Sequence, residues 1–173
     1  FDYAVMLDNG DGSEKNKKEA AKYFKILGEK GNQTAMFNYA IMLENGEGIE
    51  SNKKEAFRLY KKLADEGFAV AMFKCGLFLF NGDVITKDNN QAIRYFKMAA
   101  DNKHAHSMFI YGTLLNEGMG VEKDKKEAAR YFKMAADNGH KKAMLQYAEL
   151  LEGGEVIPQN KKEAERYRRM SKE

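Results

Sequence analysis

The sequence predicts an all-α fold, an α-solenoid of antiparallel helix pairs built from a 36-residue repeat. Three observations lead to this fold class: methionines and leucines recur every 36 residues, glycines recur at the same step, and each repeat holds two segments with the apolar period of a helix. The recurring positions are Met36, Met72, Met108 and Met144, then Leu7, Leu43, Leu79, Leu115 and Leu151, and finally Gly10, Gly46, Gly82, Gly118 and Gly154. Because nothing is inserted between these positions, the repeats are expected to stack in register.

Composition is consistent with a helical, soluble protein. The chain has 173 residues, of which 43% are apolar and 32% charged, and it contains fifteen glycines but a single proline. The 29 basic and 26 acidic residues leave a net charge of +3, which is too small to indicate nucleic-acid binding. Cys75 is the single cysteine, which excludes an internal disulfide framework. It fits a reducing compartment, so we expect a cytoplasmic or nuclear location, with any targeting signal outside this segment.

The repeat divides the chain into one repeat domain, 1–173, with ten helices. A partial unit, 1–31, is followed by full units at 32–67, 68–103, 104–139 and 140–173. The last unit is expected to act as a cap, because Arg168, Ser171 and Lys172 stand where earlier units carry apolar residues. Apolar residues near Phe1 would lack a stacking neighbour, and no initiator methionine is present. We therefore expect the sequence to be a fragment of a longer chain.

The first helix of each unit is exemplified by Gln33 to Asn45. Met36, Tyr39 and Leu43 fall on one face at the helical period and are predicted to be buried. A glycine-rich turn follows in each unit, because glycine readily adopts the positive φ that ends a helix.

The second helix, exemplified by Lys53 to Glu66, begins at an Asx residue that is followed three positions later by Glu or Gln. This spacing predicts a capping box in which the Asx side chain and the later Glu or Gln satisfy each other's backbone amides. The five predicted caps are Asn16, Asn52, Asp88, Asp124 and Asn160. Gly31, Gly67 and Gly139 are predicted to end the same helices.

The sequence resembles the Sel-one-like repeats (SLR), a sister class of the tetratricopeptide repeats, over its whole length. The resemblance is carried by the run from Tyr111 to Asp124 (YGTLLNEGMGVEKD), followed by Ala128, Tyr131-Phe132-Lys133, Ala135-Ala136 and Gly139. It implies a right-handed superhelix whose concave surface is lined by the first helix of each pair, and a role as an interaction scaffold. One departure is that Gly76 and Gly112 stand where other units have alanine.

Enzymatic chemistry finds little support in the residues, so we expect no catalytic residue, no metal and no cofactor. His104 and His140 are at equivalent positions between helices and His106 is two residues from His104, without acidic or cysteine neighbours at zinc spacing. All three are expected to be structural or merely exposed. Cys75 replaces a tyrosine of other units and is expected to be a buried apolar residue. Some bacterial members of the resembled family are linked to β-lactam hydrolysis, but that subgroup carries paired cysteines in each repeat.

A stripe on the first helices, opposite the buried face, differs from repeat to repeat. Residues required by folding should recur, so the variable stripe is either unconstrained surface or a surface shaped by a partner. Apolar residues within it favour binding of another protein or a peptide segment, and we expect no small-molecule substrate. The predicted partner-binding residues are Lys74, Leu77, Phe80, His106 and Ile110 at the centre, with Asn38, Ile41 and Thr113 beside them.

A basic ridge on the second helices is the alternative interaction surface. Its predicted members are Arg58, Arg94, Arg130 and Arg166, with Lys61, Lys97 and Lys133. Such a ridge could bind nucleic acid or an acidic membrane. Acidic residues on the same face partly neutralise it, namely Glu29, Asp65, Asp101, Asp137 and Glu173. We therefore weigh a solvated face above an electrostatic platform.

Overall fold

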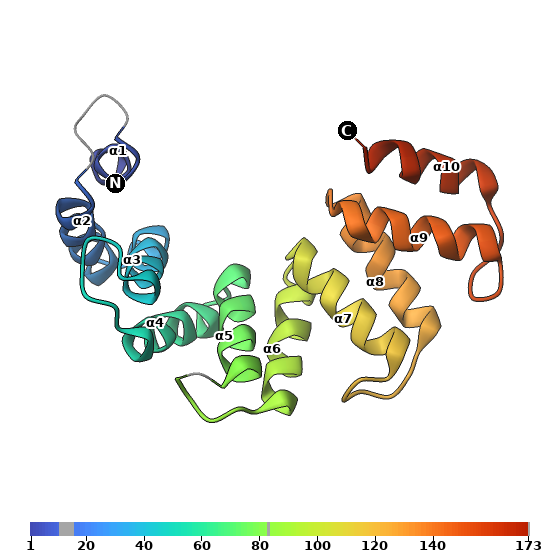
Figure 1. Ribbon diagram of the computed structural model, residues 1–173, viewed down its shortest axis with the longest axis horizontal. Helices are drawn as coiled ribbons and strands as arrows, with labels where there is room; N and C mark the ends of the chain where they lie inside the picture. Colours follow the sequence, from blue (N-terminus) through green and yellow to red (C-terminus); the bar gives the residue numbers. More distant parts are fainter. Residues whose placement is uncertain (11–15, 83, 173) are drawn as a thin grey trace. The chain divides into compact units, whose positions relative to one another are not determined.

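A computed structural model describes residues 1–10, 16–82 and 84–172 (Figure 1). Within these ranges the chain forms ten helices and no strand, so the predicted all-α solenoid is confirmed. The helices are α1 (Asp2–Asn9), α2 (Lys17–Glu29), α3 (Gln33–Asn45), α4 (Lys53–Asp65), α5 (Ala69–Asn81), α6 (Asn89–Asp101), α7 (Ala105–Glu117), α8 (Lys125–Asp137), α9 (Lys141–Gly153) and α10 (Lys161–Met170). The odd-numbered helices are the predicted first helices, and the even-numbered ones are the second.

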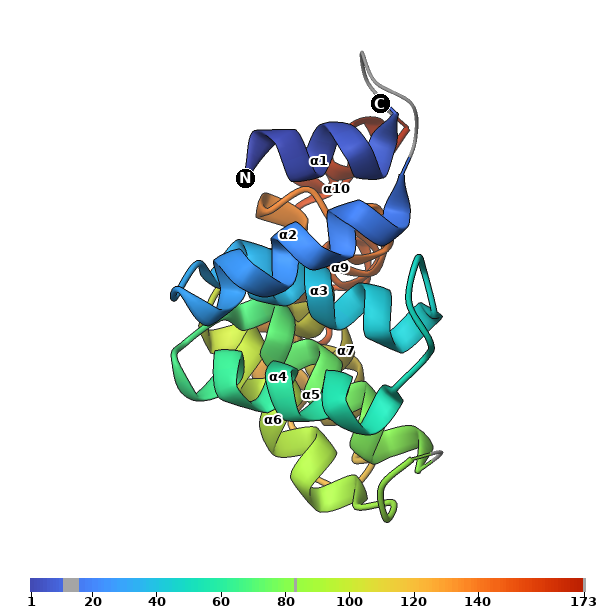
Figure 2. The same cartoon turned by 90° about the vertical axis from the view of Figure 1, so that its left-hand side faces the viewer.

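The chain forms two compact units, Phe1–Lys87 and Asp88–Glu173. In the first unit each of α1 to α4 packs against the helix that follows it, which Figures 1 and 2 both show for α2, α3 and α4. In the second unit α6 to α9 pack against their successors in the same way. None of the helices in the described part of the chain is long and apolar enough to cross a membrane.

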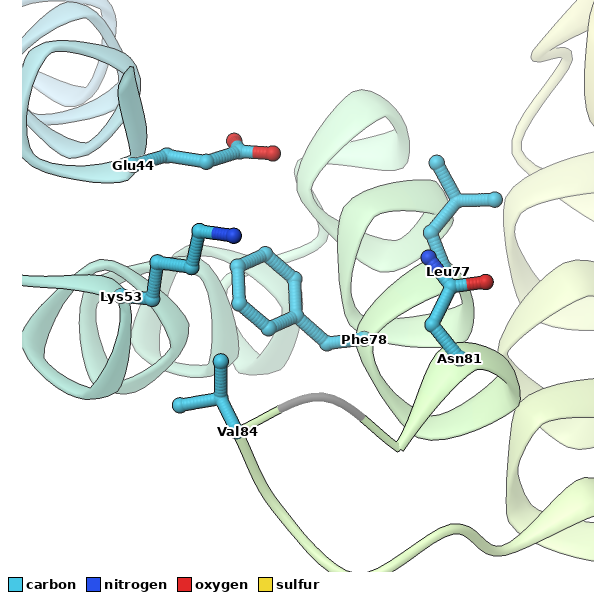
Figure 3. A pocket seen from close by; sticks show the side chains of 6 residues that line it. All are labelled: Glu44, Lys53, Leu77, Phe78, Asn81 and Val84. Atoms are coloured by element: carbon cyan, nitrogen blue, oxygen red, sulfur yellow. The ribbon is translucent and has the colours of Figure 1, made fainter.

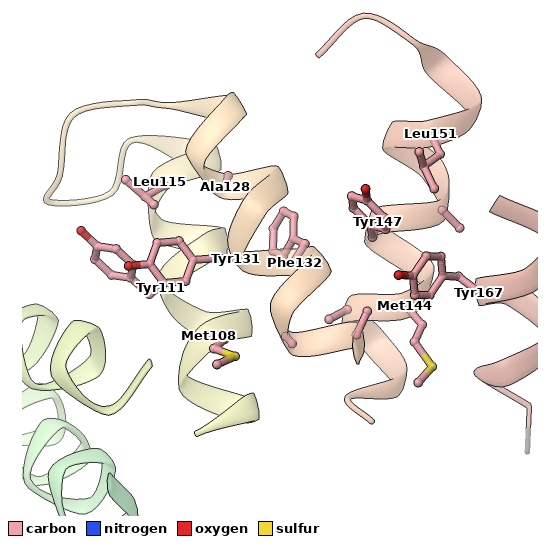
Figure 4. Close-up of a cluster of buried hydrophobic side chains, with 14 of the residues drawn as sticks. Met108, Tyr111, Leu115, Ala128, Tyr131, Phe132, Met144, Tyr147, Leu151 and Tyr167 are labelled. Carbon is pink, nitrogen blue, oxygen red and sulfur yellow. The ribbon is translucent and has the colours of Figure 1, made fainter. Parts of the chain in front are cut away.

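The core of the second unit lies between consecutive helices and is formed by the recurring residues of the repeat. Met108 and Leu115 of α7 and Met144 and Leu151 of α9 are buried against alanines and aromatic residues of α8 and α10 (Figure 4). Gly112 belongs to the close contact between α7 and α8, since a Cβ there would lie 3.0 Å from the ring of Phe132. The glycine that replaces alanine at this position therefore makes room for the phenylalanine ring.

The five predicted Asx caps are confirmed, but the predicted reciprocal half of the capping box is not formed in the first, second, fourth and fifth of them. Asn52 Oδ1 accepts a hydrogen bond from the backbone N–H of Glu55 at 3.0 Å, and the other four caps do the same three residues on. The backbone N–H of Asn52 donates instead to the carbonyl oxygen of Leu43, at 2.8 Å. The other caps with this bond use Leu7, Leu115 and Leu151. The cap residue thus joins the two helices of a repeat through the backbone of a periodic leucine.

Both kinds of predicted helix end are also present. A glycine in the left-handed region ends each first helix, as at Gly46 with a φ of 75°. Glycines of positive φ follow the second helices at Gly31, Gly67 and Gly139, whereas Lys103 takes this place after α6 with a φ of 66°. After the second helices the positive φ is therefore taken by glycine at three positions and by a lysine at one.

Candidate interaction surface

A pocket of about 120 Å³ opens in the first unit beside the predicted partner-binding residue Leu77 (Figure 3). Leu77, Phe78 and Asn81 come from the last turns of α5, and the pocket is completed by Glu44 of α3, Lys53 of α4 and Val84. Leu77 is half-buried, Phe78 is buried and Asn81 is exposed. The pocket therefore combines an apolar wall with a polar rim.

The Glu44 side chain on this rim is held in place by two partners. Its carboxylate accepts a hydrogen bond from the Tyr60 hydroxyl at 2.7 Å and pairs with the Lys74 ammonium at 2.9 Å. The Lys74 nitrogen also lies 5.7 Å from the centre of the Tyr60 ring. Burial, followed by the hydrogen bond to Glu44, raises the pKa of Tyr60 far above its ordinary value, so the hydroxyl stays a donor. Lys74 was predicted to contact a partner, and here it ties α5 to α3.

The other predicted partner-binding residues of the first unit lie on α3 and at the end of α5. Asn38 and Ile41 are half-buried on α3. The Phe80 side chain is 48% exposed, and the Lys87 ammonium lies 5.1 Å from its ring centre. An exposed aromatic ring next to the buried Phe78 and Leu79 suits a contact surface. The binding role of these residues stays a prediction.

In the second unit the predicted partner-binding residues are all on α7 but differ in burial and in hydrogen bonding. His106 is exposed, and its Nδ1 lies 3.0 Å from Nε2 of His140, which precedes α9. Ile110 is half-buried. The Thr113 hydroxyl donates to the carbonyl oxygen of Phe109 at 2.9 Å, which satisfies it within its own helix. Thr113 therefore has less to offer a partner than His106 or Ile110.

The basic ridge is largely neutralised by acids of its own helices. Arg58 and Arg130 pair with the glutamates three residues before them, and Lys97 and Lys133 pair with the aspartates four residues after them. The side-chain hydrogen bond to Arg58 is the largest cause that lowers the pKa of Glu55. Arg94, Lys61 and Arg166 are exposed, and Glu173 lies outside the described residues. This arrangement is that of the solvated face which the charge pattern favoured.

Two aspartates of the ridge also hold consecutive repeats together, a role that sequence reasoning missed. The Tyr131 hydroxyl donates to Asp101 at 2.8 Å, and the Tyr167 hydroxyl donates to Asp137 at 2.6 Å. These bonds, with burial as the larger cause, raise the pKa of Tyr167 to about 12 and also raise that of Tyr131. In both pairs the aspartate stands 30 residues before the tyrosine, so the signal was present in the sequence as a fixed offset.

The family of the chain follows from its repeats. A model of the Sel1 repeat matches the sequence five times in succession, over residues 1–32, 33–68, 69–104, 105–140 and 141–170. The chain belongs to the Sel1 repeat family. The resemblance that the sequence indicated is therefore confirmed, and Sel1 repeat proteins are generally scaffolds for interactions between proteins.

Solved structures with the same fold share a modest fraction of the sequence. A Sel1 repeat protein from Oxalobacter formigenes is 26% identical, with a TM-score of 0.89 over 99% of this chain and 70% of that one. A protective antigen of uropathogenic Escherichia coli with an SLR fold is 23% identical, with a TM-score of 0.86 over 98% of this chain and 36% of that one. Helicobacter pylori cysteine rich protein B is 24% identical, with a TM-score of 0.59 over 75% of this chain and 92% of that one. Among curated proteins there is no significant match.

Cys75 and two histidines of these Sel1 repeats have structural roles. Cys75 is fully buried, as predicted, and burial is the main cause that raises the pKa of its thiol to about 12. His104 and His140 cap α7 and α9 through Nδ1, so the structural role expected of them is confirmed. Within the described residues no group of three or more His, Cys, Asp or Glu side chains is placed to hold a metal ion.

Proposed function

We propose that this chain is a non-enzymatic Sel1 scaffold that binds a segment of a partner protein along its first helices, with one apolar side chain of the partner anchored beside Leu77. The pocket lined by Leu77, Phe78 and Val84 is the observation that carries the proposal. Its volume is about 120 Å³. That space suits one aliphatic side chain better than a whole small-molecule substrate.

The polar rim supports an extended peptide as the occupant. Asn81 is exposed at the edge of the pocket and carries both a donor and an acceptor, the two groups that a peptide main chain presents. Glu44 is held by Tyr60 and Lys74 before any partner arrives, so little side-chain freedom is lost on binding. Phe80 extends the apolar surface along α5 for a second side chain of the partner.

The test has two stages. Peptides are first selected against the intact chain from a random-sequence display library, and their affinity is then measured by fluorescence anisotropy with the wild type and with Leu77→Asp. A charge in the pocket should weaken binding by at least about thirtyfold, the loss typical of an interface hot spot. Met98→Asp is the control, because Met98 is likewise a large apolar residue but is exposed on a second helix, α6, away from the pocket. Equal affinities for the two variants would contradict the proposal.

The basic ridge gives the contrasting outcome of the same experiment. If Arg94→Glu with Arg130→Glu abolished binding while Leu77→Asp and Ile110→Asp left both fold and binding intact, an electrostatic platform on the basic ridge would replace the proposed partner surface on the first helices. Salt separates the two as well, because binding to nucleic acid weakens steeply between about 50 and 200 mM salt, whereas burial of an apolar side chain does not. Because ion pairs within the helices already neutralise much of the basic ridge, they favour the partner surface on the first helices.

A further inference from the structure

Three histidines of the second unit lie at the starts of α7 and α9, where His106 and His140 are in contact. His104 Nδ1 accepts a hydrogen bond from the backbone N–H of Ser107, at 3.3 Å, and lies 2.8 Å from the buried Ser107 hydroxyl oxygen. His140 Nδ1 accepts from the backbone N–H of Ala143 at 3.2 Å. In α3 the same position is held by Asn32, whose Oδ1 accepts from Ala35 at 2.9 Å. Two repeats therefore use a titratable cap where another uses an amide.

His106 connects the two helix starts. Its Nδ1 lies 3.0 Å from Nε2 of His140, and the His140 ring stacks on Phe109 with ring centres 4.6 Å apart. A neutral imidazole carries one N–H. Because Nδ1 of His140 is the acceptor of the cap, that proton is on Nε2 and is donated to His106 Nδ1. A chain of hydrogen bonds thus runs from the α9 backbone through His140 to α7, and it requires both rings to be neutral.

A proton on either capping ring would break this arrangement. Protonated His140 would direct an N–H at the N–H of Ala143, next to the positive end of the α9 dipole, and protonated His104 would do the same at Ser107. Among the described residues, the charged or titratable groups that lower the pKa of the capping rings include His106, His140 and Lys142. From α8, which packs against both helices, Phe132 lies 5.9 Å from Phe109 and adds an aromatic ring without charge.

We propose that His104, His106 and His140 form a histidine clasp that joins the starts of α7 and α9 at neutral pH and opens in mildly acidic solution. The clasp stands on the geometry of the caps and of the His106 to His140 bond, and it is independent of the proposed partner surface. Burial is the largest cause that lowers the pKa of both His104 and His140, followed by the neighbouring histidines and, for His140, by Lys142, which agrees with rings held neutral.

The direction of the pH dependence follows from this shift. A histidine whose pKa is lower in the folded than in the unfolded chain binds its proton mainly in the unfolded chain. Its contribution to stability is complete above the unfolded pKa of about 6.5 and is lost as the pH falls from there toward the folded pKa. Each such group raises the unfolding constant by up to about tenfold per pH unit in that window.

The chain itself supplies the matched control. His104→Asn and His140→Asn install the amide cap of α3, and His106→Thr installs Thr34, the residue at the corresponding position of that helix. Urea unfolding of the full chain is compared at pH 7.5 and pH 5.5. The wild-type unfolding constant should rise about 10- to 100-fold, whereas that of the triple variant should change less than about threefold. An equal pH dependence in both proteins would overturn the clasp.

Histidine NMR provides a second measurement that does not depend on the cooperativity of unfolding. At neutral pH His104 and His140 should carry their proton on Nε2, and His106→Thr should raise the pKa of His140 while the α9 cap persists. A proton on Nδ1 of His140 at neutral pH, or a His140 pKa that is unchanged in His106→Thr, would also overturn the proposal.

Discussion

Both compact units link neighbouring helices through a carboxylate, a tyrosine and a lysine. The carboxylate lies on a first helix in one unit and on a second helix in the other, and we call these two sets of helices the first and second layers. In the first unit Glu44, near the end of a first helix, receives the Tyr60 hydroxyl and the Lys74 ammonium. In the second unit Asp101, at the end of a second helix, receives the Tyr131 hydroxyl and the Lys97 ammonium. Asp137 repeats the second pattern with Tyr167 and Lys133. A carboxylate with one tyrosine and one lysine thus serves as the link in either layer.

The order of two neighbouring residues decides which layer is used. In α4 of the first unit the pair is Leu59-Tyr60, whereas α2 has Tyr23-Phe24 and α8 of the second unit has Tyr131-Phe132. A shift of one residue rotates a side chain by about 100° around a helix, so the hydroxyl meets a different carboxylate. The repeat therefore tolerates a shift of the tyrosine by one sequence position, because acidic residues lie on both sides of the second helix.

The largest expected loss of stability comes from truncating a buried tyrosine of the second layer to alanine. Tyr131 is 1% exposed and packs edge-on against Tyr111 at 5.0 Å, so Tyr131→Ala should lower the free energy of unfolding by about 3 to 5 kcal/mol. Urea unfolding measures the loss. Tyr131→Phe keeps the ring and should lose only about 1 kcal/mol, the contribution of one hydrogen bond. Similar losses in the two variants would mean that the hydroxyl, rather than the ring, carries the contact.

Removal of the carboxylate of the first unit should have the next largest effect. Glu44→Ala leaves the hydroxyl of the fully buried Tyr60 and the ammonium of Lys74 without their acceptor, which should cost about 2 kcal/mol. Glu152 holds the same repeat position and pairs with Arg168 at the surface. Glu152→Ala should therefore cost less than about 1 kcal/mol in the same urea experiment. Equal costs would show that burial does not distinguish the two carboxylates.

Exchange of the two residue orders tests the comparison directly. The double variant Leu59→Tyr with Tyr60→Phe gives the first unit the residue order of the second and places a hydroxyl 30 residues after Glu29. Since a link is lost at Glu44 and another gained at Glu29, stability should stay within about 1 kcal/mol of the wild type. Glu29→Ala should then cost about 1 kcal/mol in the double variant and almost nothing in the wild type. Absence of this coupling in a double-mutant cycle would refute the layer exchange.

The smallest effect is expected on the exposed side of the ridge. Arg130 pairs with Glu127 and lies 4.8 Å from the Tyr131 ring centre, but more than half of its side chain is exposed. Arg130→Ala should therefore change the free energy of unfolding by about 0.5 kcal/mol or less, measured in urea at low salt. Added salt should reduce even this difference, because exposed charges are screened. A loss above about 1 kcal/mol would assign the ridge a structural role.

Much of the architecture could be predicted because its causes are local. The helix from Gln33 to Asn45 has the predicted bounds, and the predicted helix after Asn52 ends one residue early, at Asp65. Asx caps and left-handed glycines act within three or four residues, so their spacing is sufficient to place helix ends. Burial of the periodic leucines likewise follows from the helical period.

The sequence by itself therefore determined the helices, their ends, the repeat and the buried face of each helix. Only the tertiary structure decided how polar groups pair between helices: the Asn52 amide bonds to Leu43, the Tyr131 hydroxyl to Asp101, and His106 to His140. These partners are 9, 30 and 34 residues apart in sequence. Helical period and capping rules fix the direction of a side chain on its own helix, whereas the pairing partner depends on the distance and register of the neighbouring helix, which packing alone sets.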